Sequence, residues 1–137
     1  RIEIEKFIID NNLQDRISII GWIDSKEIME HMKSSDIFIL PSWQEGMPNA
    51  LIEALACGLP SIVSAVGVIP NYLNDLDSAV LVKPKDSLAL EHALYTIIKD
   101  FELRKKLSKN GFLVAKNVFL SNKSLKKLSR VIDQSIN

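Results

Sequence analysis

Four short apolar runs, separated by helical patterns, constrain most strongly how this chain can fold. They lie at residues 17–20, 37–40, 61–64 and 79–82 and read ISII, IFIL, SIVS and AVLV. None alternates between apolar and polar residues, which is typical of parallel strands covered on both faces. The alternation of these runs with helical patterns predicts an α/β fold with a Rossmann-like, doubly wound parallel sheet.

Capping residues mark the helices beside these runs. Asp24, with Glu27 three residues later, forms a capping-box pattern that predicts a helix through Met32. Asp86 can cap the helix predicted after the last run. That segment carries a wide apolar stripe, made by Leu88, Ala89, Leu90, Ala93, Leu94, Ile97 and Ile98. After Phe101 only helices are predicted.

The helix predicted between Pro48 and Cys57 has the clearest boundaries. Pro48 suits the first helical position, Gly58 suits a left-handed stop, and Pro60 prevents continuation. Because this helix follows the run 37–40, its N-terminus lies at the carboxyl end of a parallel strand, where open α/β sheets bind ligands. Free N–H groups and the positive end of the helix dipole favour phosphate at that place.

Length and composition fit a single domain over residues 1–137. The chain is 47% hydrophobic and 25% charged, which is ordinary for a globular core. The single cysteine, Cys57, excludes an internal disulfide and a multi-cysteine metal site, and it fits a reducing compartment. The N-terminal residues are too charged for a secretory signal, so a cytoplasmic protein is expected. Residues 54–73 carry no charge, but glycines and prolines divide them, which predicts buried core and not a membrane span.

Charge is distributed unevenly along the chain, although it sums to zero. Residues 1–100 hold 8 Lys+Arg and 15 Asp+Glu, whereas residues 101–137 hold 9 and 2. The basic tail has two interpretations: solvated helix faces, or attraction to an anionic surface, either lipid headgroups or a partner domain. The second would place the protein peripherally at the inner face of a membrane, through Lys123, Lys126, Lys127 and Arg130. Nucleic acid is not expected as a partner, since the tail lacks interleaved aromatic residues.

Glu45 and Glu53, with seven residues between them, form the candidate functional pair. Asn49 and Glu53 would share one helix face, opposite a buried side that contains Leu51 and Leu55. A buried carboxylate without a partner is costly, so Glu53 must reach solvent or a hydrogen-bonding partner such as the vicinal hydroxyls of a ribose. Two alternatives remain from the residues alone. Glu53 can be an exposed helical residue without function, or the pair can be the acid and base of a glycoside hydrolase, which leaves no role for a phosphate-binding helix.

The stretch PSWQEGMPNALIEALACGLPSIVSAVGVIP, residues 41–70, resembles the E-x7-E region of retaining glycosyltransferases of family 4, also called group 1, which have the GT-B fold. The flanking segments extend the resemblance over nearly residues 10–115. It implies the C-terminal, nucleotide-sugar-binding half of a GT-B fold, incomplete at its N-terminus and ending in helices. An N-terminal acceptor-binding domain would be its partner, and the fragment alone would be inactive.

The function implied is the donor-binding part of an enzyme that moves a sugar from a nucleotide-diphosphate sugar to an acceptor with retention. The resemblance points to polysaccharide, lipopolysaccharide or glycolipid synthesis. A non-catalytic nucleotide-sugar-binding or assembly module of the same fold remains the alternative. Neither a metal ion nor a cofactor is implied, since the substrate is a UDP- or GDP-linked sugar.

The resemblance also implies residue roles. Glu53 would bind the ribose hydroxyls, and the backbone amides of Ala50 and Leu51 would bind the diphosphate. Glu45 would be the catalytic residue, and the donor sugar would face Glu45, Gly46, Met47, Pro48 and Asn49. The base would lie against Gly21, Trp22 and Ile23. Trp43 fits either core packing or contact with a sugar, and His31 and His92 lack the spacing of metal ligands.

Two departures from the family pattern are visible. The family often shows Gly-Gly-x-Pro-Glu where this chain has Gly67-Val68-Ile69-Pro70-Asn71, so Val68 and Asn71 alter the acceptor-side loop. The four runs correspond by motif to strands three to six of a sheet ordered 3-2-1-4-5-6. Run 17–20 is therefore expected at one edge, two absent strands away from the other three runs. That gap would expose apolar strand edges, which soluble proteins avoid. Either the sheet closes with run 17–20 beside run 37–40, or another chain fills the gap, or the fragment is unstable outside its parent chain; the third outcome is expected.

Overall fold

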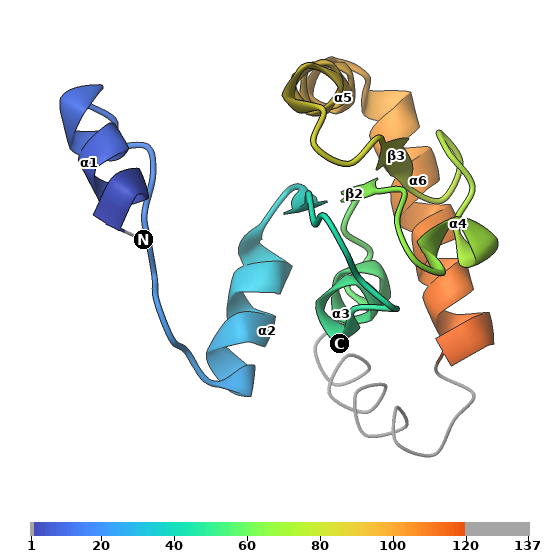
Figure 1. Cartoon of the computed structure of the whole chain (residues 1–137). Helices are drawn as coiled ribbons and strands as arrows, with labels where there is room; N and C mark the ends of the chain where they lie inside the picture. The colour runs from blue at the N-terminus through green and yellow to red at the C-terminus, as the bar shows by residue number, and fades with distance from the viewer. Residues whose placement is uncertain (1, 120–137) are drawn as a thin grey trace.

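The computed structural model describes residues 2–119, and the basic residues predicted to face a membrane, 123–130, lie outside them. In chain order the elements are α1 (Ile2–Asp10), α2 (Ser25–Ser34), β1 (Phe38–Leu40), α3 (Asn49–Ala56), β2 (Ser61–Ser64), α4 (Ile69–Tyr72), β3 (Val80–Val82), α5 (Ser87–Lys99), α6 (Phe101–Val114) and the π-helix η1 (Ala115–Phe119). Figure 1 shows their arrangement.

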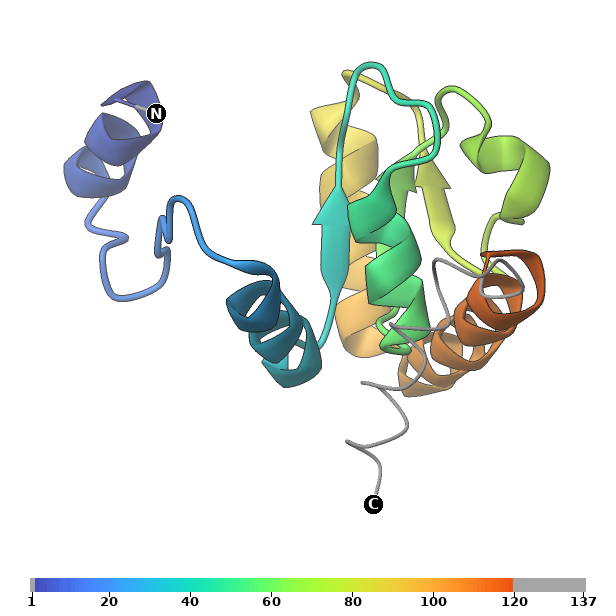
Figure 2. The ribbon, with the colours of Figure 1, turned by 90° about the horizontal axis from the view of Figure 1, so that it is seen from below.

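A parallel sheet of order β1-β2-β3 forms the centre of the fold. In its register Ile39 lies beside Ile62, and Val63 lies beside Leu81. Helix α3 covers one face and α5 covers the other (Figure 2). Because the strands are parallel, the loops that follow β1 and β3 emerge at the same edge, at the top of Figure 2. The predicted Rossmann-like α/β fold is confirmed.

Two apolar clusters hold the helices against the sheet. On the α3 face, Leu51 and Leu55 are fully buried and pack with Val63. On the α5 face, Ile62 packs with Ile97 and with other buried residues of α5 and α6. Burial on both faces explains why these strands carry no polar alternation. Among the helices of residues 2–119, none is long and apolar enough to cross a bilayer.

Three of the four predicted strands are confirmed to within one residue, but the prediction of a strand at 17–20 is wrong. Residues 17–20 have no regular secondary structure, and Ile17, Ile19 and Ile20 are exposed. A strand requires a neighbour that pairs its N–H and C=O groups. No strand within residues 2–119 takes that place, so the run forms no strand despite its apolar composition.

The predicted helix caps are confirmed. The Asp24 side chain accepts hydrogen bonds from the amides of Lys26 and Glu27, and Glu27 accepts one from the Asp24 amide, which completes the capping box. The Asp86 carboxylate accepts a bond from the Ala89 amide at the start of α5. The apolar stripe predicted on α5 is wider than the face of α5 that packs against the sheet, because Leu88 and Ile98 at the margins of the stripe are exposed.

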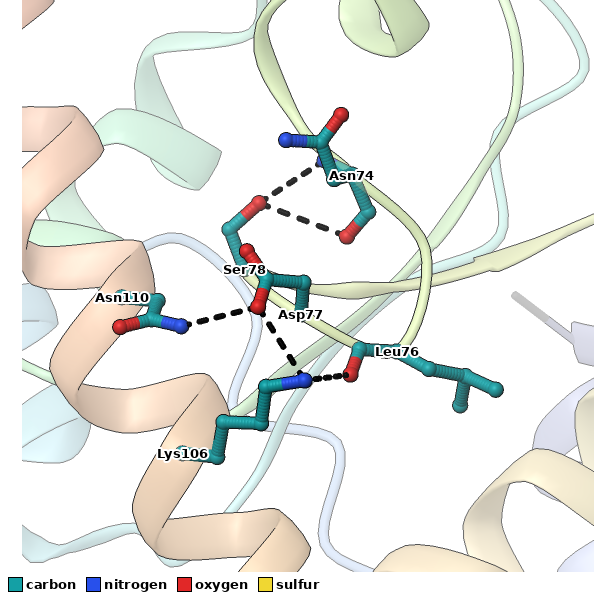
Figure 3. Close-up of polar contacts among 6 residues, drawn as sticks. All are labelled: Asn74, Leu76, Asp77, Ser78, Lys106 and Asn110. Carbon is teal, nitrogen blue, oxygen red and sulfur yellow. Dashed lines mark hydrogen bonds and ion pairs between the residues drawn. The ribbon is translucent and has the colours of Figure 1, made fainter.

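Polar side chains fix the turn before β3 against α6, as Figure 3 shows. The Asp77 carboxylate accepts a hydrogen bond from Asn110 Nδ2 at 3.0 Å and pairs with Lys106 Nζ at 3.1 Å. Lys106 also donates to the carbonyl of Leu76. In the same helix, Gly111 lets α6 pack closely against Leu55 of α3, since a Cβ at Gly111 would lie 2.8 Å from Leu55 Cδ2. These contacts attach the turn that leads into β3 to α6.

Helix α1 was not predicted from the sequence. In Figures 1 and 2 it lies apart from the sheet, joined to α2 by an extended segment. Several of its apolar side chains are exposed, among them Ile2, Ile4 and Phe7. The site considered below is formed by the sheet and its loops, without α1.

Candidate functional site

The loop of residues 41–48 carries the first candidate carboxylate, Glu45, at the carboxyl end of β1 (Figure 2). The Ser42 hydroxyl donates a hydrogen bond to Glu45 Oε1 at 3.0 Å. Both residues are half-buried. This bond between residues three positions apart restricts the rotamers of Glu45, so its carboxylate is held at the edge of the sheet.

Gly67 determines how closely the loop 41–48 approaches the segment between β2 and α4. It follows β2 with φ of +57°, and a Cβ added there would overlap the carbonyl oxygen of Glu45 and lie 3.0 Å from that of Gly46. Only glycine combines this conformation with such a close backbone approach. The backbone on both sides of the Glu45–Gly46 peptide bond is therefore positioned by a residue more than twenty positions later.

The start of α3 is open to a ligand. Pro48 is the N-cap, one position earlier than its predicted place in the first turn, and it makes no side-chain cap. The amides of Leu51 and Ile52 donate to the Pro48 carbonyl at 3.1 and 3.3 Å. Those of Asn49 and Ala50 have no acceptor within residues 2–119, and the first turn contains no acidic residue. Unsatisfied amides and an uncompensated dipole favour an anion here.

Glu53 lies one turn further along α3, on the same face as the exposed Asn49. It is half-buried, and within the described part of the chain its side chain makes no hydrogen bond or ion pair. Burial raises the pKa of its carboxyl, because partial removal from water disfavours the charged form. By contrast Leu51 and Leu55 are completely buried, as predicted, and so is Ala54. Glu53 therefore has an acceptor carboxylate without an internal donor.

Cys57 continues this face of α3 toward α2. Its Sγ lies 3.3 Å from Sδ of Met29. Burial raises the pKa of the Cys57 thiol; Lys33 lowers that pKa and the charge of Glu53 raises it. The thiol is half-buried and packs as a small apolar group. The left-handed stop after it is confirmed, with Gly58 at φ +72°.

Residues 21–23, predicted to line the base, are not brought to the loop of Glu45. Trp22 is fully exposed. Ile23 lines an apolar hollow with Phe38 and Leu59, which lie at or near the starts of β1 and β2 and hence at the opposite end of the sheet. Because run 17–20 is not held in the sheet, nothing directs residues 21–23 to its carboxyl edge. Their role in base binding stays a prediction.

A second hollow, not predicted from the sequence, opens at the carboxyl edge on the α5 face. It has a volume of about 370 Å³, and its wall includes Pro41, Trp43, Ser64, Val82, Asp86 and Leu90. Trp43 is 67% exposed, which excludes its interpretation as a core residue. Lys85 Nζ lies 4.6 Å from the centre of the Trp43 ring. The sequence signals that could have indicated this hollow are Trp43, just after the run 37–40, and the polar KPKD segment just after the run 79–82, about forty residues later.

His31 and His92 are both exposed. Within residues 2–119, no three His, Cys, Asp or Glu side chains lie close enough together to hold a metal ion.

Comparison with known proteins places this chain in a family. The family model described as glycosyl transferases group 1 matches residues 2–114. The UDP-Gal:alpha-D-GlcNAc-diphosphoundecaprenol alpha-1,3-galactosyltransferase of Escherichia coli is 37% identical over 122 residues, which cover 80% of this chain and 29% of that enzyme. An uncharacterized glycosyltransferase of Methanocaldococcus jannaschii is 29% identical over 109 residues, or 80% of this chain and 31% of that protein. The chain thus spans about a third of the length of these curated relatives.

Solved glycosyltransferase structures superpose on this chain. The C-terminal domain of a group 1 glycosyl transferase from Francisella tularensis superposes with a TM-score of 0.78 at 30% identity, covering 85% of this chain and 60% of that one. Anabaena HepE in complex with UDP superposes with a TM-score of 0.80 at 20% identity, covering 96% and 36%, and this likeness shows the fold alone. Given the family match over residues 2–114 and the sequence identity to known members, the chain belongs to the glycosyl transferases of group 1.

Proposed function

We propose that this chain is the donor-binding part of a retaining glycosyltransferase, which moves a sugar from a UDP- or GDP-linked donor to an acceptor in polysaccharide, lipopolysaccharide or glycolipid synthesis. The observation that carries the proposal is the open start of α3, with Glu45 before it and Glu53 one turn beyond it. The name of the Escherichia coli relative gives a UDP-sugar as donor and a lipid-diphosphate sugar as acceptor. HepE has been solved with UDP-glucose. Both support this donor class.

The diphosphate would bind at the start of α3. The amides of Asn49 and Ala50 are unsatisfied within residues 2–119, and the Leu51 amide makes only a local turn bond to Pro48. In the proposed complex the amides of Ala50 and Leu51 donate to phosphate oxygens. No acidic side chain in the first turn opposes the anion.

The ribose would then lie over Glu53, about 7.5 Å along the helix axis from Pro48. An ionised carboxylate accepts hydrogen bonds from two adjacent hydroxyls. Burial already raises the pKa of Glu53, so it carries a desolvation cost in the free protein. Ribose hydroxyls would offset that cost, which makes the residue selective for a ligand that bears a diol.

Glu45 is the proposed catalytic residue and would face the donor sugar together with residues 46–49. Its carboxylate is held by Ser42 and its backbone by Gly67, so it is oriented before the donor arrives. In the retaining reaction the bond from the anomeric carbon to the diphosphate oxygen breaks, and the acceptor oxygen bonds to that carbon on the same face. The acceptor proton passes to the departing diphosphate. The protein contributes positioning and stabilisation of the charge that develops on the phosphate.

Calorimetric titration with UDP, GDP and their sugars tests this assignment. Glu53→Gln is expected to weaken binding of the best ligand by roughly 1.5–3 kcal/mol, the range for a hydrogen bond to a charged group. Glu91→Gln on the exposed face of α5 is the matched control and should bind as the parent protein does. Equal affinities for the parent protein and Glu53→Gln would remove Glu53 from the ribose site.

The partners proposed with this function are an N-terminal acceptor-binding domain and an anionic membrane surface. The second rests on the basic tail, 9 Lys+Arg against 2 Asp+Glu over residues 101–137. It places the protein in the cytoplasm, peripherally at the inner face of the membrane. The alternative, a non-catalytic nucleotide-sugar-binding or assembly module of the same fold, would bind the donor without transferring its sugar. An assay of sugar transfer to a lipid-diphosphate acceptor by the full natural protein distinguishes the two.

A further inference from the structure

The hollow beside Trp43 is not used by the proposed donor site. It lies on the α5 face of the sheet, whereas Glu53 lies on α3, which covers the opposite face. We call it the Trp43 pocket and define it by Pro41, Trp43, Ser64, Val82, Asp86 and Leu90. Its volume of about 370 Å³ falls within the range of about 300–1,000 Å³ for small-molecule sites. The loop 41–48 joins the two places, since it carries both Trp43 and Glu45.

Ser64 supplies a hydroxyl to the wall of the Trp43 pocket. The residue ends β2 and is 1% exposed. Its hydroxyl makes no hydrogen bond to any residue in the part of the chain that the structure describes. Alternation along β2 puts Ser64 on the same face as Ile62, which packs with α5. Within residues 2–119 no side-chain N or O atom is both fully buried and without a hydrogen-bond partner, so the Ser64 hydroxyl is reached from the hollow. It is therefore open to a hydrogen bond with a ligand bound there.

Asp86 supplies an acceptor at the same place. Its Oδ1 accepts the hydrogen bond from the Ala89 amide at 2.9 Å, and its second carboxylate oxygen has no hydrogen-bond donor among residues 2–119. The Lys83 and Lys85 side chains, also at the pocket, are exposed donors. The pocket therefore offers a hydroxyl, a carboxylate oxygen and ammonium groups around an apolar floor of Val82 and Leu90.

This combination suits a sugar ring better than a free phosphate or a nucleobase. The Asp86 carboxylate lies at the N-terminus of α5, where it already occupies the position that an anion would take. Sugar hydroxyls both donate and accept, so they can bond to a carboxylate, a serine and a lysine together. The exposed indole of Trp43 is amphipathic and presents a large apolar surface for the C–H groups of a pyranose.

We propose that the Trp43 pocket is a subsite for a pyranose ring of the acceptor. The inference rests on the proposed function, because the donor ring is assigned to residues 45–49 and a second ring must then belong to the acceptor. Trp43 stacks on the ring, while Ser64 and Asp86 bond to its hydroxyls. Trp43 and Glu45 lie two residues apart in one loop, so acceptor binding and donor orientation are coupled.

Titration of the full chain with methyl pyranosides of glucose, galactose and N-acetylglucosamine tests the proposal. The indole N–H signal of Trp43, assigned with Trp43→Phe, is followed by NMR in ¹⁵N-labelled protein. At least one glycoside is expected to shift it saturably. Ser64→Ala and Trp43→Ala should each weaken the binding of that glycoside at least fivefold. Because Trp43→Ala has no Trp43 indole signal, its binding is followed through the NMR signals of the glycoside. Ser64→Ala removes a hydroxyl that has no partner among residues 2–119, so it should fold as the parent does.

Tyr95→Ala is the matched control. Tyr95 is an exposed aromatic on α5 with Lys99 Nζ 5.7 Å from its ring centre, so it repeats the lysine–aromatic pair outside the pocket. Its loss should leave glycoside affinity unchanged.

Parallel titrations with UDP, uridine and inorganic phosphate separate the outcomes. If UDP binds and no glycoside shifts Trp43, the acceptor subsite is refuted while the proposed function stands. A saturable shift of Trp43 by uridine alone would assign the pocket to a base, and one by phosphate alone would assign it to an anion; each refutes the sugar assignment. If glycosides bind at Trp43 and no nucleotide or nucleotide sugar binds anywhere, the proposed function fails and the acceptor role fails with it.

Discussion

Replacement of Gly67 by alanine is the sharpest test of how the candidate site is held. Two separate costs apply. Alanine at φ +57° costs roughly 1–2 kcal/mol relative to glycine. Its Cβ would also overlap the Glu45 carbonyl oxygen, and a backbone group cannot rotate away as a side chain does, so relief requires movement of the loop 41–48. Overpacking of this kind adds about 1–3 kcal/mol. The expected loss in the free energy of unfolding is about 2–5 kcal/mol.

Gly58→Ala is the control that isolates the second cost. Gly58 has a similar φ of +72°, but its Cβ would meet only Ser108 Oγ at 3.3 Å, a side-chain atom that can shift. This variant should lose only about 1–2 kcal/mol. Urea denaturation followed by circular dichroism gives both values, and calorimetric titration with a UDP- or GDP-sugar gives donor affinity. We expect Gly67→Ala to lose donor affinity and Gly58→Ala to keep it.

Equal stabilities for the two alanine variants, together with unchanged donor affinity in Gly67→Ala, would refute the reasoning. That result would mean that the Glu45 loop does not need to approach the crossover after β2 in order to bind its ligand.

Four further predictions concern other parts of the molecule. Burial raises the pKa of Glu53, so the folded state holds the proton of this carboxyl more tightly than the unfolded state does. The contribution of Glu53 to the free energy of unfolding therefore falls as pH rises through the range in which glutamate titrates. Glu53→Gln should remove that pH dependence in urea titrations at a series of pH values. Gly111→Ala should lower the free energy of unfolding by about 1–3 kcal/mol, since its Cβ would lie 2.9 Å from the Ser78 carbonyl; a stabilised variant would show that α6 has room to move. Lys85 has φ +64°, so Lys85→Gly should be about 1–2 kcal/mol more stable than Lys85→Ala by thermal melting, both having lost the contact with Trp43; equal stabilities would contradict this conformation. The full chain should sediment with anionic vesicles and be released by salt, at about 1 kcal/mol per basic residue near the surface; sedimentation that is absent or independent of salt would contradict a membrane role.

Sequence patterns predicted what depends on residues close together in the chain. The caps at Asp24 and Asp86 are confirmed because a cap is a bond between a side chain and amides two or three residues away. The end of α3 at Gly58 follows from the conformational freedom of one residue. The strands at 38–40, 61–64 and 80–82 are confirmed because burial on both faces leaves a continuous apolar run.

The tertiary structure decided what depends on partners far along the chain. Run 17–20 has the composition of a strand, but strand formation requires a neighbour to satisfy the backbone, and none is present within residues 2–119. The Trp43 pocket combines residues from the ends of three strands, so no single segment of sequence indicates it. The position of Glu45 depends on the close approach of Gly67. The sequence marks the two carboxylates by type and spacing, and a bond from Ser42 holds Glu45 locally. Packing between distant segments positions the Glu45 backbone against Gly67 and leaves the Glu53 side chain without a partner among residues 2–119.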